Sequence, residues 1–204
     1  MIFLNITSIP LVVIAKIVSF LNIISFENDI KKSLGIIAKF SNIKIDKNLI
    51  EVLILAEDRR NKLHCGVDTI AILRAIKVRI IEKTYQGAST IEQQFIRVAT
   101  NRFEKTFYRK FREQVLAVML NKIATKEDIA KSYLFIAYYG YNLTGLKAIE
   151  KICNNLDKVE NIEAIKIVSR LKYPQPKYPN EIWILKNKRR VSYIEKLIKN
   201  NNNL

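Results

Sequence analysis

The sequence predicts an all-α protein, because amphipathic runs dominate it and chain breakers are rare. Only 5 glycines and 4 prolines occur among its 204 residues, and apolar residues recur at helical spacing along most of the chain. Hydrophobic residues make up 49% of the sequence, enough for one domain with a real core. The two cysteines, Cys65 and Cys153, form neither a disulfide framework nor a metal-binding pattern.

Residues 1–26 form a strongly apolar segment that Pro10 and Lys16 interrupt. About 20 apolar residues suffice to cross a bilayer, and one central lysine costs about 2.5–3.5 kcal/mol. We therefore expect a membrane anchor over 1–27, with an interfacial helix or a buried core helix as the alternatives. Lys31 and Lys32 follow the segment, and the positive-inside rule would place that flank in the cytoplasm.

The next part of the chain predicts three helices. An exposed helix comes first, followed by a linker over 41–48, and a second helix covers 47–57. Asp68 is expected to cap a third helix that reaches about Lys83. The apolar face of this third helix predicts packing in the core through Ile72, Leu73, Ile76 and Ile80.

Residues 107–124 show the strongest helical pattern, with expected core positions Phe111, Val115, Val118 and Met119. Thr125 is expected to cap the next helix, which reaches about Tyr139. Further helices are expected over 141–170.

Pro174 and Pro176 mark a helix stop. Trp183 and a basic cluster then precede a last helix over 191–199, and residues 200–204 are expected to be a disordered tail.

The net charge of +16 and the pI near 9.8 point to an anionic partner. Nucleic acid, an acidic membrane surface and a phosphorylated substrate are all compatible with this charge, and so is a merely solvated lysine surface. The sequence has no zinc-finger spacing, no aromatic RNA-binding motif and no basic region joined to heptads. A nucleic-acid partner is therefore not expected.

Three segments carry candidate chemistry. Glu57 ends an apolar run, where desolvation disfavours a charged carboxylate, and Arg59 beside it could hold an anion. The alternative is a solvated turn with local ion pairs.

The segment 87–94 predicts a helix N-terminus, whose free N–H groups suit a pyrophosphate. Ser89 with Glu92 fits a capping box, so an ordinary helix start is the alternative. Polar groups that could contact the anion follow there: Thr90, Gln93, Gln94 and, one turn on, Arg97.

Glu113 follows Arg109 by four residues in the helix over 107–124. An ordinary i,i+4 ion pair, worth about 0.2–0.5 kcal/mol, explains this spacing as well as a catalytic role does.

Taken together, four segments in order resemble the motifs of the peptidoglycan glycosyltransferases, glycosyltransferase family 51. They are Glu57–Arg60 followed by His64, Gly66 and Asp68; Gly87–Gln94; Arg109–Glu113; and, more weakly, Arg189–Val191. The resemblance implies a lysozyme-like catalytic lobe and a smaller membrane-proximal jaw lobe, which together form a transglycosylase domain over 28–199. The chain leaves no room for a transpeptidase domain, so it is most similar to the monofunctional form.

The resemblance implies polymerisation of lipid II into glycan strands, with inversion and release of undecaprenyl pyrophosphate. Glu57 would be the general base, and Glu113 would assist departure of the pyrophosphate, directly or through a divalent metal. The carboxyl separation is expected to be comparable with the about 6.5–9.5 Å of inverting glycosidases. The implied substrate-binding residues are Arg59, Thr90, Gln93, Gln94, Arg97, Arg109 and Lys110. No cofactor is required by the sequence, and Mg²⁺ or Mn²⁺ would be the metal if one assists.

The implied partners are lipid II, the growing strand, an anionic bacterial membrane and other cell-wall synthesis proteins. The implied location is the inner membrane, with the catalytic domain on its outer side. The sequence departs from the family pattern at Asn61, Glu92, Lys131 and Phe135. The departures keep open a degenerate homologue that only binds lipid II or cell wall. The similarity of the family's main lobe to lysozyme keeps open a lysozyme-like hydrolase that uses the same two glutamates.

Overall fold

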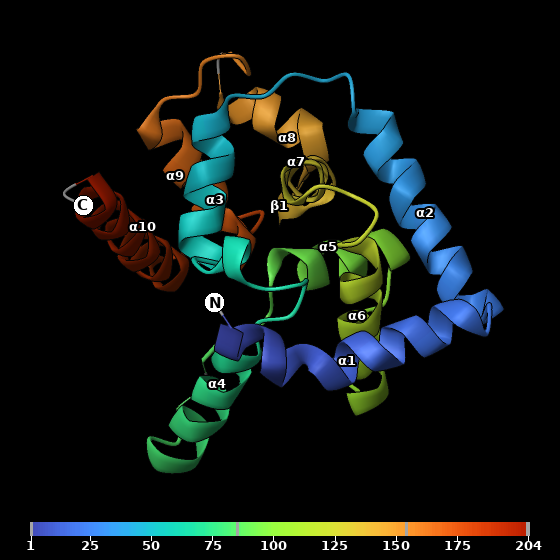
Figure 1. The fold of residues 1–204 in the computed structure, drawn as a ribbon. Coiled ribbons are helices and arrows are strands. Elements are labelled where there is room, and N and C mark those ends of the chain that lie inside the picture. The colour runs from blue at the N-terminus through green and yellow to red at the C-terminus, as the bar shows by residue number, and fades with distance from the viewer. Residues whose placement is uncertain (1, 85, 154, 203–204) are drawn as a thin grey trace. The chain divides into compact units, whose positions relative to one another are not determined.

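The predicted all-α class is confirmed by the computed structural model, which describes residues 2–84, 86–153 and 155–202. Helices make up almost all of its regular structure (Figure 1). Within the described residues the only strands are the short β1 (Tyr138–Gly140) and β2 (Leu143–Thr144). The chain divides into two compact units, the first formed by residues 1–39 and 60–129 and the second by residues 40–59 and 130–204.

The first unit contains α1 (Ile2–Phe20), most of α2 (Ile24–Phe40), the 3-10 helix η1 (Asn61–Leu63), α4 (Thr69–Ile81), α5 (Ile91–Thr100) and α6 (Phe107–Leu120). Helix α6 packs against both α1 and α5, and α1 also contacts α4. Arg112 on α6 ties α2 to this core, because its guanidinium pairs with Asp29 at 2.7 Å.

The second unit contains α3 (Lys47–Glu57), α8 (Gly145–Ile152), α9 (Asn161–Lys172) and α10 (Glu181–Asn202). Helix α7 (Lys126–Ile136) begins in the first unit and continues in the second. Helices α3, α9 and α10 pack against one another, and the antiparallel pair β1–β2 lies against α8.

Side-chain caps fix where several helices begin. Asp46 accepts a hydrogen bond from the backbone N–H of Asn48 at the start of α3. Asp68 accepts one from Ala71 at the start of α4, as predicted, and also pairs with Arg60 at 2.8 Å. These caps satisfy backbone donors that a helix start otherwise leaves unpaired.

The prediction of a Ser89–Glu92 capping box is wrong by one residue. Thr90 is the N-cap of α5, and its hydroxyl accepts from the backbone N–H of Gln93 at 3.3 Å. Glu92 does not fold back over the helix start. It lies fully buried and pairs instead with Lys126.

The predicted core face of α4 is also wrong, because most of its apolar residues are exposed. Leu73 is 57% exposed, Ile76 50% and Ile80 72%. Apolar periodicity predicted the helix, but among the described residues of the first unit this side of it is largely uncovered.

Other helix ends differ from the predictions. Helix α6 ends at Leu120 and helix α7 at Ile136, both earlier than predicted. Strand β1 begins at Tyr138, two residues after the end of α7. Helix α10 already begins at Glu181, so Trp183 and the basic cluster lie inside it. The helix also continues through Asn202, into the segment predicted to be a tail.

Helix α1 is continuous through Pro10 and presents two different faces. Ala15 and Val18 are buried, whereas Ile9, Val13 and Ile17 are each about half exposed. Within the described residues, no single helix has both the length and the apolar character of a membrane span. The segments Thr7–Phe20 and Ile24–Phe40 meet that criterion only as a pair, with a 99° bend between them.

Candidate active site

Helices α5 and α6 bring three cationic side chains of the first unit onto one buried carboxylate. Glu113 is only 2% exposed. Arg97 donates from Nε to Glu113 Oε1 at 2.8 Å and from Nη2 to Oε2 at 3.2 Å. Arg109 also donates to Oε1, and Lys110 Nζ lies 3.8 Å from Oε2. We call Arg97, Arg109, Lys110 and Glu113 the α5–α6 cation cluster.

Local sequence explains how these side chains meet. Thr106 caps α6 by accepting from the backbone N–H of Arg109, which fixes the first turn of that helix. Arg109 and Glu113 are four residues apart and so lie on one face of it. Arg97 comes from the last turn of α5, which ends at Asn101 in a left-handed conformation with φ of 56°.

Lys110 connects the cluster to the start of α5. Its Nζ donates to Ser89 Oγ at 2.7 Å and to Gln93 Oε1 at 2.9 Å. The pKa of Lys110 is lowered from 10.5 to about 8, chiefly by burial, with Glu113 raising it and Arg97 and Arg109 lowering it. An anion bound here would favour the charged ammonium.

Thr90 and Gln93 are buried at the start of α5. The Thr90 hydroxyl donates to the carbonyl of Gly66 at 2.7 Å, so it ties the loop of the first motif to α5. The amide nitrogen Nε2 of Gln93 has no partner within the described residues. Gln94 is half buried on the next position of the helix. The roles of these three residues toward a substrate stay predictions.

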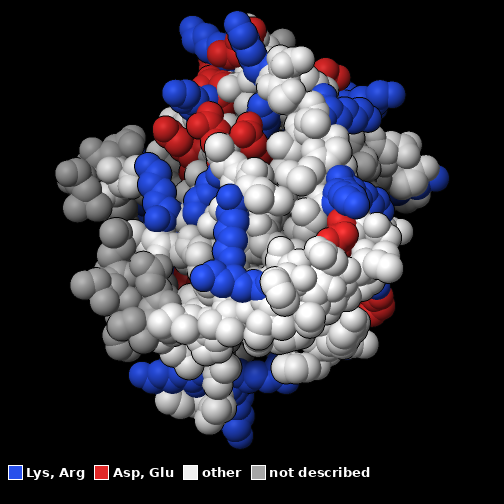
Figure 2. All heavy atoms as spheres, turned by 45° about the vertical axis from the view of Figure 1, so that its right-hand side comes forward, with Lys and Arg blue, Asp and Glu red and all other residues white. Residues whose placement is uncertain are grey.

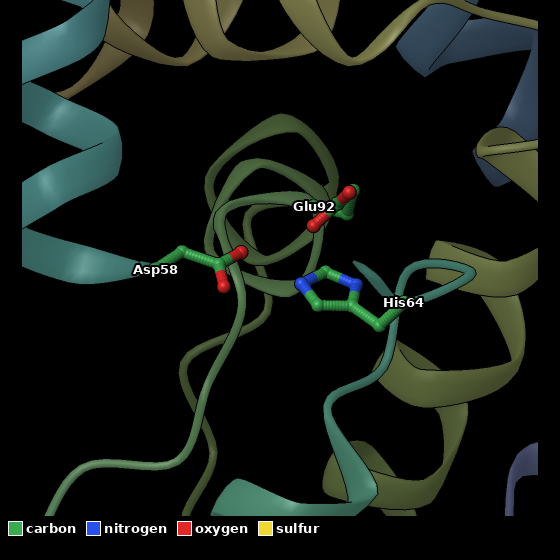
Figure 3. A group of neighbouring side chains, drawn as sticks. All are labelled: Asp58, His64 and Glu92. Carbon is green, nitrogen blue, oxygen red and sulfur yellow. The ribbon is translucent and has the colours of Figure 1, made fainter. Parts of the chain in front are cut away.

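Glu92 and His64 face one another beside this helix start (Figure 3). A carboxylate oxygen of Glu92 and a ring nitrogen of His64 lie within 4.8 Å. The Lys126 ammonium already pairs with Glu92 Oε1, and His64 Nδ1 accepts from the backbone N–H of Gly66 at 3.2 Å. A metal cation at this position would face the Lys126 ammonium, so the surroundings of these two side chains do not favour a metal.

The second unit holds the other predicted catalytic residue. Glu57 is the last residue of α3, and Arg190 of α10 donates to its Oε1 at 2.6 Å. Arg59, the other predicted residue of this unit, donates from Nη2 to the hydroxyl of Tyr193 at 2.7 Å.

The predicted site residues therefore form two groups, one in each unit. Arg97, Arg109, Lys110 and Glu113 meet directly, and Thr90, Gln93 and Gln94 lie at the adjoining helix start. Glu57 and Arg59 belong to the second unit. The predicted separation of the two glutamates stays a prediction. Sequence reasoning missed Arg190 and Tyr193, for which the weak motif at 189–191 was the only signal.

Comparison with known proteins identifies the family behind this arrangement. The family model described as Transglycosylase matches residues 28–197, most of the chain. The chain belongs to the transglycosylase family.

Similar curated proteins carry the name penicillin-binding protein 1A. That of Rickettsia felis is 33% identical over 152 residues, which cover 72% of this chain and 19% of the relative. That of Neisseria cinerea is 33% identical over 155 residues, 75% of this chain and 19% of the relative. That of Escherichia coli is 36% identical over 110 residues, 53% of this chain and 13% of the relative. The chain thus spans less than a fifth of each of these proteins.

The transglycosylase fold accommodates the departures in its motifs. Phe135 is buried and its ring meets that of Phe40 edge to face, with centroids 5.2 Å apart. Lys131 donates to the carbonyl of Ser41 at 3.0 Å, and Asn61 is buried. These three side chains have structural roles, and the negative charge of Glu92 is compensated by the Lys126 ammonium. The all-α architecture agrees with the lysozyme-like catalytic lobe that the resemblance implies.

Proposed function

We propose that this transglycosylase polymerises lipid II into peptidoglycan glycan strands by inverting glycosyl transfer, with release of undecaprenyl pyrophosphate. The observation that carries the proposal is the α5–α6 cation cluster, in which Arg97, Arg109 and Lys110 converge on Glu113. Arg109 and Lys110 come from the first turn of α6 and Arg97 from the last turn of α5. Three converging cations suit a diphosphate, whose charge grows as the glycosidic bond breaks. Family membership supplies the reaction class.

The cluster would act on the leaving group. Loss of one fixed donor to a developing charge typically costs about 10²–10³-fold in turnover. Because Arg97 uses two nitrogens on Glu113, it can transfer one of them to a phosphate oxygen and keep the other on the carboxylate. Lys110, which is held by Ser89 and Gln93, would add a third cation without large rearrangement.

The surroundings of Glu113 do not fit a divalent cation. Both carboxylate oxygens accept from Arg97, and Arg109 and Lys110 add two further positive charges. Mg²⁺ prefers several free oxygen ligands and would be repelled by these cations. We therefore assign Glu113 the task of holding the arginines and the lysine in position, without a metal at this carboxylate.

Glu57 would be the general base for the acceptor sugar. Its carboxylate takes the proton of the 4-hydroxyl as that oxygen bonds to C1 of the donor and the bond from C1 to the pyrophosphate breaks. A positioned base contributes typically about 10²–10⁴-fold. Glu57 is assigned this role because it matches the glutamate of the first motif.

An anionic membrane surface is the proposed setting. On the first unit, exposed apolar residues follow one face of α1 and continue at its corner with α2: Ile9, Val13, Ile17, Phe20, Leu21 and Ile24. Figure 2 shows a broad uncharged surface on this side, with lysine and arginine and a smaller number of acidic residues around it. Apolar surface bordered by cations suits acyl chains beneath anionic head groups, where a lipid-linked substrate is found.

The test is polymerisation of lipid II by the purified chain in detergent, with Glu57→Gln and Glu113→Gln beside it. Glu51→Gln, an exposed glutamate on the same helix as Glu57, is the matched control. Strands from the wild type and the control but not from Glu57→Gln support the proposal. A folded wild type that binds lipid II without polymerising it would favour a degenerate binder. Fragmentation of finished peptidoglycan would favour a hydrolase.

A further inference from the structure

We infer that Arg190 is the positioning residue of the base, holding the Glu57 carboxylate in a fixed orientation at the end of α3. The inference rests on the proposed function for Glu57 as the base. Its own evidence is the contact of a nine-tenths buried guanidinium with both the side chain and the backbone of one helix end.

The end of α3 is an unfavourable place for a negative charge. A helix C-terminus carries a partial negative charge and leaves its last carbonyls without partners within the helix. Glu57 is the last residue of α3, and the carbonyl of Ala56 is one of these last acceptors. A carboxylate fixed there needs a cation that also satisfies the exposed backbone.

Arg190 meets both needs with one nitrogen. Its Nη2 donates to Glu57 Oε1 at 2.6 Å and to the Ala56 carbonyl at 3.0 Å. The Arg190 side chain is 8% exposed and that of Glu57 16%. A guanidinium can bridge two acceptors in a fixed plane, whereas a lysine ammonium on its flexible stem does so less well.

A second layer of contacts fixes the guanidinium itself. It lies over the ring of Tyr193, 5.3 Å from the centroid, one turn further along α10. Arg59 donates to the hydroxyl of the same tyrosine at 2.7 Å. Helix α10 also packs against α3, so Arg190 reaches Glu57 from a rigid element.

These contacts give Arg190 a defined part in the proposed step. The base must be a carboxylate before the acceptor hydroxyl arrives, and it becomes a neutral acid when it takes the proton. Arg190 holds the carboxylate in a fixed orientation through its hydrogen bond to Oε1, so it acts through Glu57. Loss of Arg190 should therefore reduce turnover and leave substrate affinity largely unchanged.

The experiment compares kcat and KM for lipid II polymerisation by Arg190→Met and Arg190→Lys with the wild type. Lys188→Ala, which replaces an exposed cation two residues away on α10, is the control. We expect Arg190→Met to lower kcat by about 10–100-fold, less than loss of the base itself, with KM changed by about twofold or less. Arg190→Lys should recover part of the loss, and Lys188→Ala should behave as the wild type.

Chemical rescue separates a positioning role from a structural one. Guanidinium ion at millimolar concentration should restore part of the turnover of Arg190→Ala and should not restore Glu57→Gln. A folded Arg190→Met with wild-type kcat, or one whose loss lies entirely in KM, would overturn the inference.

Unfolding free energies test the contact between Arg190 and Glu57 without requiring the protein to be active. The unfolding free energies of Arg190→Met, Glu57→Gln and the double variant should be clearly non-additive, because the two side chains share one contact. Additive effects would overturn the pairing even if the wild type polymerises lipid II. An inactive wild type with non-additive effects would instead count against the proposed function alone.

Discussion

Lys126 and Glu92 form an ion pair in the first unit in which the carboxylate is almost wholly enclosed. The side chain of Glu92 is 1% exposed and that of Lys126 24%. The second oxygen of Glu92, Oε2, has no partner within the described residues. The carboxylate therefore depends on Lys126 for its only charge compensation there.

Removal of Lys126 alone should be strongly destabilising. Lys126→Met leaves the buried charge of Glu92 uncompensated, which typically costs about 3–5 kcal/mol. Chemical denaturation of the purified chain measures this change. The double variant Glu92→Gln/Lys126→Met should recover most of the loss, because it removes both charges. Equal losses in the single and double variants would show that Lys126 acts through packing alone.

Gly66 should not tolerate any side chain. Its φ is +100°, and a Cβ there would lie 2.5 Å from the carbonyl oxygen of Ala117 on α6. We expect Gly66→Ala to lower the unfolding free energy by at least about 2 kcal/mol. Gly35→Ala is the control, because nothing lies within 4 Å of a Cβ at that position in α2. That variant should be neutral or slightly stabilising, and similar losses in both would contradict the argument.

Anion binding at the α5–α6 cation cluster should depend on the charge of Lys110. Because burial lowers the pKa of Lys110 to about 8, its ammonium is charged below that pH and loses its charge as the pH rises through 8. The affinity for inorganic pyrophosphate, measured by calorimetry, should therefore fall between about pH 7 and 9. The arginine in Lys110→Arg stays charged throughout, so its affinity should fall less.

Titration of pyrophosphate itself affects both proteins equally, so the difference between them reports on Lys110. Parallel curves for the wild type and Lys110→Arg would contradict the prediction.

The lowered pKa of Lys110 also makes the stability of the protein depend on pH. The folded state binds this proton more weakly than the unfolded state, so the contribution to stability rises with pH between about 8 and 10.5.

Part of the site could be predicted from sequence because it is local. The spacing of Arg109 and Glu113 places them on one face of a helix, and the structure pairs them. The contact of Arg97 with Glu113 depends on how α5 packs against α6, and periodicity carries no information about that. Arg190 lies 133 residues from Glu57 in the chain, so only the tertiary fold reveals their contact.

The errors in the predicted elements have physical causes. Serine and threonine cap helices almost equally well, so Ser89 and Thr90 could not be distinguished by type. The prediction starts the last helix at Val191, after the basic cluster, but lysine and arginine are good helix formers and the cluster lies inside α10. For α4, apolar spacing defines a face of the helix but not what covers it.

The exposed apolar face of α1 yields the last prediction, binding of the first unit to anionic bilayers. Val13 is 47% exposed and Ile17 50%, four residues apart on one side of the helix. Burial of such a side chain in an apolar phase is worth about 1.5–3 kcal/mol. Val13→Glu/Ile17→Glu should therefore weaken sedimentation with phosphatidylglycerol-containing vesicles by at least about tenfold. The matched control is Ile162→Glu on α9, where an isoleucine is 63% exposed in the second unit. Retention of vesicle binding by the α1 variant, or equal loss by the control, would show that this face does not enter the bilayer.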